Sequence, residues 1–212
     1  MVSITETIMN LKIKDLIYRK DKIMPEKVCQ YFIDFFKNNI EKTGKEASKK
    51  LIEGEPISYQ LDNFKCLHLN NLSEKNPEIE QAKNLAFKYI EMMILNYTQF
   101  LKINISSAIN SEWFTTTSNI RIIRYKEGEQ ILDHLDVNRR NRAACTINLN
   151  EDYEGGEFSF FSGKELYTFK TGDSIIFPAE PIFIHGTKKI KKGTRYSINC
   201  FLYNIDQAND IK

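Results

Sequence analysis

From residue 119 onwards, the sequence consists of short runs of β-branched and aromatic residues that are separated by turn residues. Short strands at regular spacing are typical of a sandwich or barrel, and a set of this size fits a double-stranded β-helix of the jelly-roll or cupin-like type. No helical period continues through this half of the chain. The candidate strands cover residues 119–126, 130–137, 143–149, 157–161, 165–169, 173–177, 182–185 and 195–203.

Two helices are predicted before these strands. The first covers residues 25–40, where Pro25 suits the first position of a helix and apolar residues follow at helical spacing. The second begins at Asn76 and Pro77, carries acidic residues in its first turn and extends to about residue 102. Its apolar face is predicted to comprise Ile79, Ala82, Ala86, Tyr89, Met93 and Tyr97.

The segment between the two helices has a different character. Residues 41–56 are charged and contain Gly44, Gly54 and Pro56, so we expect a mobile connection there. Residues 57–70 alternate in polarity, which favours a pair of strands. The expected fold is therefore α+β and mainly β, with a double-stranded β-helix core and the N-terminal helices packed on one sheet.

Composition and charge exclude several classes of protein. Hydrophobic residues make up 42% and aromatic residues 12% of the chain, which is typical of a globular protein and not of a disordered one. A net charge of +2 gives no general argument for a nucleic-acid or anionic-membrane partner. The most apolar helical stretch, around residues 85–97, is interrupted by Lys88 and Glu91 and is too short to span a bilayer. The first residues lack a continuous apolar segment, so no signal peptide is expected.

The four cysteines, Cys29, Cys66, Cys145 and Cys200, are widely separated and form no CxxC pair. This spacing favours reduced, mostly buried thiols over a disulfide framework or a zinc site. We therefore expect a cytoplasmic protein.

Three residues have the chemistry of a metal site. His134 and Asp136 are two positions apart, so their side chains share one face of an extended strand, and His185 follows later in the chain. Two imidazoles and one carboxylate can occupy one face of an octahedral iron and leave three positions open, which is the pattern of non-haem Fe(II) oxygenases. Arg195 could pair through its planar fork of donors with the far carboxylate of a dicarboxylate cosubstrate.

The flanking sequence extends this pattern to a family. The runs IRIIRYKEGEQILDHLDV (120–137), EGGEFSFF (154–161) and GDSIIFPAEPIFIHGTKKIKKGTRYSINCFLY (172–203) resemble the 2-oxoglutarate- and Fe(II)-dependent dioxygenases, and among them the prolyl 4-hydroxylase-like group. An HxD pair alone is a weak signal. The ordered set of HxD, Gly-Gly-Glu, Gly-Asp, His-Gly and a basic residue ten positions later is a specific one.

The resemblance implies a role for each of these residues. His134, Asp136 and His185 would be the catalytic iron ligands, and Arg195 would hold the distal carboxylate of 2-oxoglutarate. Tyr125, in the Arg-Tyr pair before a glycine turn, would donate its hydroxyl to the cosubstrate; the alternative is a half-buried aromatic residue whose hydroxyl faces water. The implied cofactors are Fe(II), 2-oxoglutarate and O2, with ascorbate as a further candidate.

The function expected from the resemblance is hydroxylation of an unactivated C–H bond, with a prolyl residue of a peptide or protein as the first candidate substrate. A free amino acid or another small metabolite is the second. A non-catalytic cupin-like module that binds a metal or ligand is a third interpretation, which the retained ligands and Arg195 disfavour. We expect no nucleic-acid or membrane partner, and the sequence predicts no particular oligomeric state. One domain is expected over residues 1–212, with a helical support region (1–118) and a catalytic β-helix core (119–204).

Several neighbouring residues are candidates for a role in the site. By strand alternation, Ser197, Asn199 and Phe201 should share the face of Arg195 and line the pocket. Asn148 is a weaker candidate for a cosubstrate contact, because many relatives carry an aromatic hydroxyl there. Phe201 stands where nucleic-acid-repair members carry a second arginine, which argues against nucleobase demethylation.

Other polar residues near the motifs are expected to be structural or exposed. Asp133 should point to the strand face opposite His134, and His68 is interpreted as an ordinary strand histidine. Gly155 and Gly156 predict a turn with positive φ. The lysines of 188–195 should lie in a solvated hairpin at Gly193. The rim arginines Arg139, Arg140 and Arg142 are expected to be exposed, with binding of an acidic substrate as the alternative.

Overall fold

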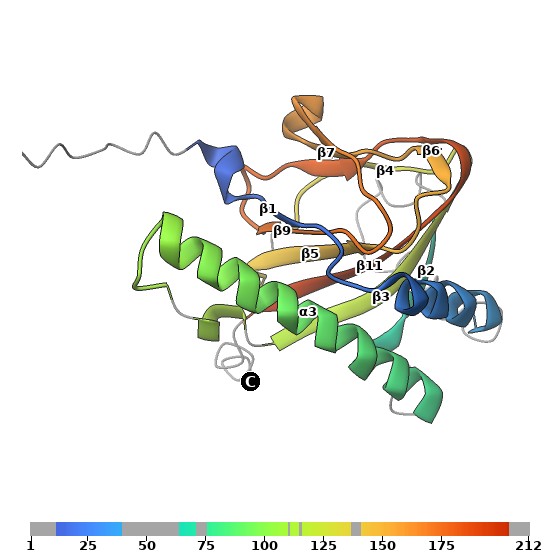
Figure 1. Cartoon of the computed structure of the whole chain (residues 1–212). Coiled ribbons are helices and arrows are strands. Elements are labelled where there is room, and N and C mark those ends of the chain that lie inside the picture. The colour runs from blue at the N-terminus through green and yellow to red at the C-terminus, as the bar shows by residue number, and fades with distance from the viewer. Residues whose placement is uncertain are drawn as a thin grey trace, which may run out of the picture.

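The structure, a computed structural model, describes residues 12–39, 64–70, 76–109, 111–114, 116–136 and 141–203. Two antiparallel sheets form its β core (Figure 1). The larger sheet runs β1 (Tyr18–Lys20), β9 (Ser174–Pro178), β5 (Ala143–Asn148), β11 (Ile190–Tyr203), β3 (Thr116–Lys126), β2 (Lys65–His68), and β6 (Tyr153–Gly155) also pairs with β11. The smaller sheet runs β4 (Ile131–His134), β10 (His185–Thr187), β7 (Phe158–Phe160), β8 (Glu165–Tyr167).

Two helices cover the outer face of the larger sheet. One spans residues 26–39 and the other is α3 (Pro77–Asn104), which crosses β5, β11 and β3 (Figure 1). Short 3-10 turns occur at Ile13–Leu16, Ser111–Phe114 and Phe161–Gly163. The arrangement confirms the expected α+β, mainly β class and the packing of N-terminal helices on one sheet.

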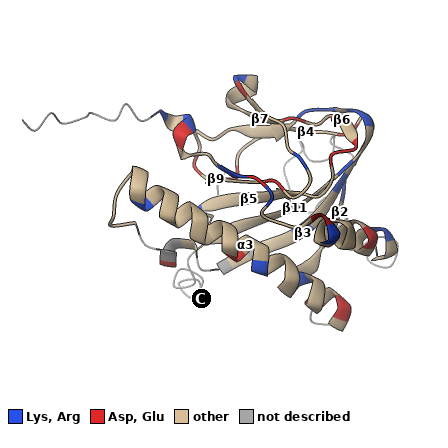
Figure 2. Cartoon of the chain, in the orientation of Figure 1, with Lys and Arg blue, Asp and Glu red and all other residues tan. Residues whose placement is uncertain are grey.

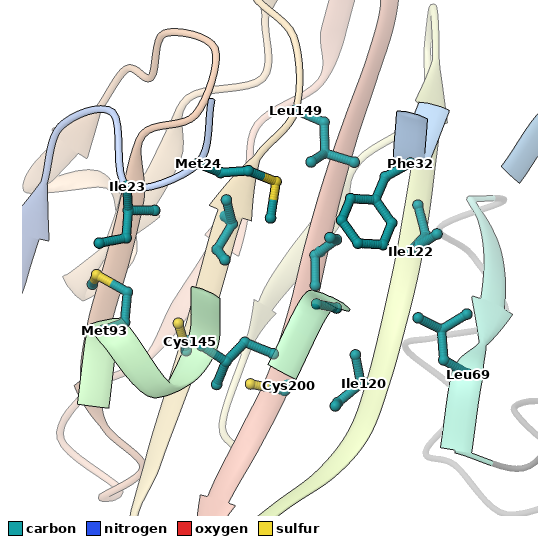
Figure 3. Close-up of a cluster of buried hydrophobic side chains, with 14 of the residues drawn as sticks. Ile23, Met24, Phe32, Leu69, Met93, Ile120, Ile122, Cys145, Leu149 and Cys200 are labelled. Carbon is teal, nitrogen blue, oxygen red and sulfur yellow. The ribbon is translucent and has the colours of Figure 1, made fainter. Parts of the chain in front are cut away.

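The main core lies between these helices and the sheet. Phe32 from the first helix, Met93 from α3 and Cys200 from β11 belong to one buried cluster (Figure 3). A helix buries an apolar stripe on one side only, so the sheet supplies the second surface that this core needs. On α3 the predicted apolar face is confirmed except at Tyr89, which is only half-buried, while Ile90 beside it is fully buried.

The long helix begins where the sequence predicts. The side-chain oxygen of Asn76 accepts hydrogen bonds from the backbone N–H groups of Glu78 (2.9 Å) and Ile79 (3.4 Å), which would otherwise have no partner within the helix. Glu78 and Glu80 place negative charge in the first turn, where the helix dipole favours it. Local capping therefore sets the start of the element that covers the larger sheet.

Strand boundaries differ from the prediction where the pairing partner is distant in sequence. β1 and β6 have three residues each and were not predicted. β10 begins at His185 and not at 182, because the chain turns before it, with the Phe183 N–H donating to the Glu180 carbonyl (2.9 Å). β11 begins at Ile190 and continues through Gly193, so the predicted hairpin at Gly193 is wrong, although Lys191 and Lys192 are exposed as expected.

Parts of the predicted pattern lie outside the described residues. These parts are the connection at 41–56, the first half of the predicted strand pair at 57–70, and Arg139 with Arg140. Within the described part of the chain, no helix is long and apolar enough to cross a membrane. Lys and Arg residues are interspersed with Asp and Glu along the helices and strand ends (Figure 2).

The Asn76 cap yields a stability prediction. We expect Asn76→Ala to lower the free energy of unfolding by about 1 kcal/mol, because two N–H groups at the start of α3 lose their acceptor. Asn84→Ala, at an exposed position within the same helix, is the matched control and should leave stability unchanged or slightly raised, since Ala has the higher helix propensity. Urea unfolding of both variants measures the difference, and equal effects would contradict the capping role.

Candidate functional site

The three predicted metal ligands meet at the pairing of β4 with β10. His134 ends β4, His185 begins β10, and their Cα atoms are direct partners in the antiparallel register. Asp136 follows β4 by two residues. The Asp136 Oδ1 atom lies 3.4 Å from His134 Nε2, and its Oδ2 atom lies 3.2 Å from His185 Nε2. One potential ligand atom from each residue falls within 4.8 Å of the others, so the group could hold a metal ion.

Backbone carbonyls orient both imidazoles. His134 Nδ1 is 2.8 Å from the Leu132 carbonyl oxygen, and His185 Nδ1 is 3.0 Å from the Phe183 carbonyl oxygen. A carbonyl oxygen only accepts, so each Nδ1 carries the hydrogen and donates it. A metal would then replace the proton on each Nε2 and bind the lone pair there, the arrangement by which proteins orient ligating histidines.

The triad is largely buried and its carboxylate is ionised. The side chains of His134, Asp136 and His185 are 13%, 5% and 5% exposed. Burial alone would raise the pKa of Asp136, but the positive charge of His185 and hydrogen bonds from both histidines hold it well below its usual range. Burial acts to lower the pKa of His134, whereas its hydrogen bond to Asp136 raises it above the ordinary value. A cation binding here would displace histidine protons.

Aromatic residues enclose one side of the triad. The ring of Phe158 is stacked on His185 with centroids 5.5 Å apart, and the ring of Phe177 meets it edge-on at 4.6 Å. Phe160 is 5.7 Å away. These rings belong to a buried cluster between the two sheets, so they limit water access and the local dielectric.

The strand pairing leaves no space for a side chain at Gly186, directly after His185. A Cβ atom there would lie 2.6 Å from the Ile131 carbonyl oxygen and 2.9 Å from Asp133 Oδ1. Only a residue without a side chain lets β10 approach β4 this closely. Asp133 itself is exposed, as expected for the face opposite His134.

Arg195 is a fully buried cation with one unpaired donor. The residue is 1% exposed; its Nε donates to Asn148 Oδ1 at 3.0 Å and its Nη1 to Thr187 Oγ1 at 3.4 Å. Its Nη2 atom is buried and has no hydrogen-bond partner, and no acidic side chain pairs with it among the described residues. A buried charge is unfavourable without a counter-charge, so the surroundings of Arg195 suit a bound carboxylate.

Tyr125 lies beside Arg195. The two residues are direct partners across β3 and β11, and the guanidinium carbon is 5.6 Å from the tyrosine ring centroid. Tyr125 is 1% exposed, so the alternative of a half-buried ring with a wet hydroxyl is wrong. Burial raises the pKa of Tyr125 well above its ordinary value, while Arg195 and a hydrogen bond with Thr187 act in the opposite sense. The hydroxyl therefore stays protonated and can donate.

The other predicted pocket residues have more specific positions than the sequence indicated. Asn148 accepts from Arg195 and from the Tyr153 hydroxyl (3.2 Å), so it positions the arginine. Ser197 donates to Asn199 (2.9 Å), which donates to Thr146 on β5 (3.0 Å). These contacts form a polar strip on the inner face of the larger sheet.

Sequence reasoning missed two residues of this site, Thr187 and Arg121. Thr187 follows His185 by two positions and so shares its strand face, a signal that alternation could have found. Arg121 precedes Tyr125 by four positions on β3 and lines the same cavity as His134, Asp136 and His185. Alternation from Tyr125 would have found it too.

Three further predictions near the site agree with the structure, whereas Arg142, which was expected to be exposed, is half-buried. Gly155 and Gly156 have φ of 80° and 68°, as the predicted turn requires. All four cysteines are free and buried, and burial raises the pKa of Cys66 to about 11 and that of Cys29 to about 12. His68 is buried on β2 and belongs to no potential metal-binding group found among the described residues.

The fold and the site together define a double-stranded β-helix with a buried two-histidine, one-carboxylate cluster at the pairing of two strands in its smaller sheet. Residues 120–203, the part of the chain that carries the triad and Arg195, match the model of the 2OG-Fe(II) oxygenase superfamily. No curated protein sequence matches it.

Solved structures with a similar fold include three prolyl hydroxylases. A prolyl-4-hydroxylase from Pseudomonas putida has a TM-score of 0.62 at 12% identity, with 89% of this chain and 92% of that chain covered. The viral collagen prolyl hydroxylase from Paramecium bursaria Chlorella virus-1, solved with 2-oxoglutarate, gives 0.55 at 17%, covering 90% and 96%. A prolyl hydroxylase from Trichoplax adhaerens, solved with a peptide fragment of hypoxia inducible factor, gives 0.65 at 13%, covering 93% and 88%. At sequence identities this low, the structural similarity shows that the fold is shared.

The triad geometry predicts which carboxylate binds the metal. We expect Asp136→Asn to weaken Mn(II) or Fe(II) binding by at least about 100-fold, because the change removes the anionic ligand between the two histidines. Asp133→Asn, the exposed carboxylate of the same segment, is the matched control and should bind metal like the wild type. Calorimetric titration under anaerobic conditions measures both, and normal affinity in Asp136→Asn would refute the assignment.

Proposed function

We propose that this chain is an Fe(II)- and 2-oxoglutarate-dependent dioxygenase that hydroxylates an unactivated C–H bond of a prolyl residue in a peptide or protein. His134, Asp136 and His185 would hold the iron, and Arg195 with Tyr125 would hold 2-oxoglutarate. The observation that carries the proposal is the unpaired, buried Nη2 donor of Arg195, which contacts Thr187 and Tyr125, two residues that line the triad cavity.

The residues of the site fit both iron and 2-oxoglutarate. Two neutral imidazole nitrogens and one ionised carboxylate are a donor set that suits Fe(II) and leaves coordination positions for other ligands. Thr187 links the two halves of the site, because it lies on β10 two residues after His185 and accepts from Arg195. A dicarboxylate with one end at Arg195 would therefore extend toward the metal ligands.

When bound, iron with 2-oxoglutarate and O2 supplies oxidising power that inserts oxygen into a C–H bond, while 2-oxoglutarate becomes succinate and CO2. Arg195 pairs with the distal carboxylate and holds it in one orientation, and the protonated Tyr125 hydroxyl donates into the same pocket. The Asp136 carboxylate stays ionised and neutralises part of the metal charge. Phe158, Phe160 and Phe177 exclude water behind His185.

Support for a prolyl substrate comes from the fold. The similar structures include prolyl hydroxylases, one of them in complex with a peptide. A free amino acid or small metabolite is the second candidate. A non-catalytic cupin-like module is disfavoured. A module that binds only a metal would not need Arg195, a buried cation with one N–H group that has no acceptor.

We also propose that the chain acts as one domain, with residues 1–118 supporting the catalytic core at 119–204. In support of this, β1 and β2 from the first segment pair with β9 and β3 of the second. The free thiols support a reducing, cytoplasmic location. Ascorbate is proposed as an auxiliary reductant.

Arg195 provides a test of cosubstrate binding. Loss of this group would leave the distal carboxylate buried and unpaired, at a cost of about 2–5 kcal/mol. Arg195→Ala should therefore raise the 2-oxoglutarate KM steeply while Mn(II) binding persists, and Arg195→Lys should fall between because it keeps the charge but loses the planar fork. A wild-type KM in Arg195→Ala would show that another residue anchors the cosubstrate.

The substrate class can be tested directly. We expect the iron-loaded protein to add one oxygen to proline-containing peptides, detected by mass spectrometry, and to leave matched peptides with alanine at that position unchanged. Succinate production without substrate would separate an oxygenase from a binding module, which produces none. Hydroxylation of free proline or another metabolite with every proline peptide inert would refute the peptide proposal and leave the oxygenase assignment intact.

A further inference from the structure

Arg121 is a second buried cation that faces the triad cavity. It lies on β3, where its position alternates in phase with Ile123 and Tyr125, so its side chain is on the inner face of the larger sheet. The residue is 8% exposed and lines the same cavity as His134, Asp136 and His185. Its guanidinium carbon lies 5.4 Å from the centroid of the Phe201 ring, which supports the side chain in the cavity.

The two arginines occupy different levels of this face. Tyr125 pairs with Arg195 across β3 and β11, whereas Arg121 pairs with Asn199. Four residues separate these levels along each strand, roughly 13 Å at the rise of a β-strand. Arg121 and Arg195 therefore serve different parts of the cavity. At the Arg121 level, Asn199 and Thr146 add polar groups to the lining.

The Arg121 charge reaches the metal ligands. Burial acts first to lower the pKa of His134 and Asp136 acts to raise it, but the Arg121 guanidinium adds to the lowering. It also acts to lower the pKa of Tyr125. The Arg121 guanidinium is therefore near enough to both side chains to act on their ionisation.

The charges of the site with iron and 2-oxoglutarate bound indicate a role for Arg121. The iron and Arg195 together carry the positive charge that Asp136 and the two carboxylates of 2-oxoglutarate neutralise. Among the described residues that line the triad cavity, Asp136 is the one acid and Arg121 the one arginine or lysine, so Arg121 can present its charge to a ligand beside the reacting centre. Such a space favours a ligand that brings a negative charge, and the planar fork of arginine fits a carboxylate.

We propose that Arg121 binds a carboxylate of the substrate that is oxidised, and so selects substrates with an acidic group close to the reacting carbon. This inference rests on the proposed function and narrows its substrate class. The carboxylate could come from an Asp or Glu side chain beside the target residue of a peptide, or from the α-carboxylate of a free amino acid or a chain end. Arg121 is the specificity-determining residue in either case.

The test compares binding of matched probes to protein loaded with Zn(II), which is redox-inert, and 2-oxoglutarate. The first arm uses blocked proline peptides with Glu or Gln on either side of the proline. The second arm uses free L-proline against L-prolinamide, and L-alanine against L-alaninamide. Each pair differs by one charge. Calorimetry measures the affinity of four proteins for each probe: the wild type, Arg121→Gln, Arg121→Lys and Arg124→Gln.

Arg124→Gln is the matched control. Arg124 is on the same strand, but it alternates to the other face and pairs with Glu129 at 3.7 Å. We expect the wild type and Arg124→Gln to bind the acidic member of one arm at least about tenfold more tightly than its neutral counterpart, as for other close charge pairs. Arg121→Gln should reduce this preference to within about twofold and keep its 2-oxoglutarate affinity, and Arg121→Lys should retain part of it.

Each outcome has a definite meaning. A preference in the first arm identifies an acidic peptide, and one in the second identifies a free carboxylate. The inference fails if the wild type shows no preference in either arm, if the preference survives in Arg121→Gln, or if Arg121→Gln weakens 2-oxoglutarate binding, which would make Arg121 a cosubstrate contact. Circular dichroism checks that the variants fold. If Arg121→Gln does not fold, Arg121→Lys replaces it in the comparison, and its preference should be smaller than that of the wild type.

The outcome also separates this inference from the proposed function. Hydroxylation of proline peptides irrespective of charge would support prolyl oxidation and refute the role of Arg121. Arg121-dependent binding of alanine over its amide, with no oxidation of any proline probe, would support the role of Arg121 and refute prolyl specificity.

Discussion

The site depends on the register between β4 and β10. His134 and His185 are far apart in sequence, and their direct pairing across these two strands brings both imidazoles to one side of Asp136. Successive residues of a strand face opposite sides, so a slip of one residue would turn one histidine away from the cavity. Gly186 secures this register because a side chain there would collide with the Ile131 carbonyl. The absence of a side chain at one position is thus a condition for the metal site.

The larger sheet supplies the rest of the chemistry. β11 carries Arg195 and Asn199 on its inner face, β3 carries Tyr125 and Arg121 on the same face, and their direct pairing sets these polar groups at two levels. The outer face of the same strands packs against α3 and the helix at 26–39. Helix packing on one face therefore holds rigid the strands whose other face carries the cations.

Local patterns predicted the features that local chemistry determines. The start of α3 follows from the Asn76 cap, and the shared direction of His134 and Asp136 follows from strand alternation. The ordered motifs also indicate the class of site, because each motif supplies a ligand or a turn that the site needs. These signals depend on residues that are near one another in the chain.

Features that arise from long-range pairing could not be predicted in the same way. β6 has only three residues, and its place is set by β11, nearly forty positions later. The hairpin expected at Gly193 is absent because β11 pairs with β6 up to Gly193 and with β3 from Thr194 onwards. Alternation could have indicated the direction of Arg121, but its importance depends on Asn199 and Phe201, which only the fold brings next to it.

The buried charges of the cavity do not favour the folded state of the protein. Two arginines and an ionised Asp136 lie in a space walled by phenylalanine rings, where apolar residues of similar size would be at least as stable. Arg195 also keeps a buried donor without a partner, which is unfavourable until a carboxylate accepts from it. A ligand that supplies this partner binds only the folded state and therefore stabilises it. The unfavourable electrostatics of the free protein thus become favourable binding energy for an anionic ligand.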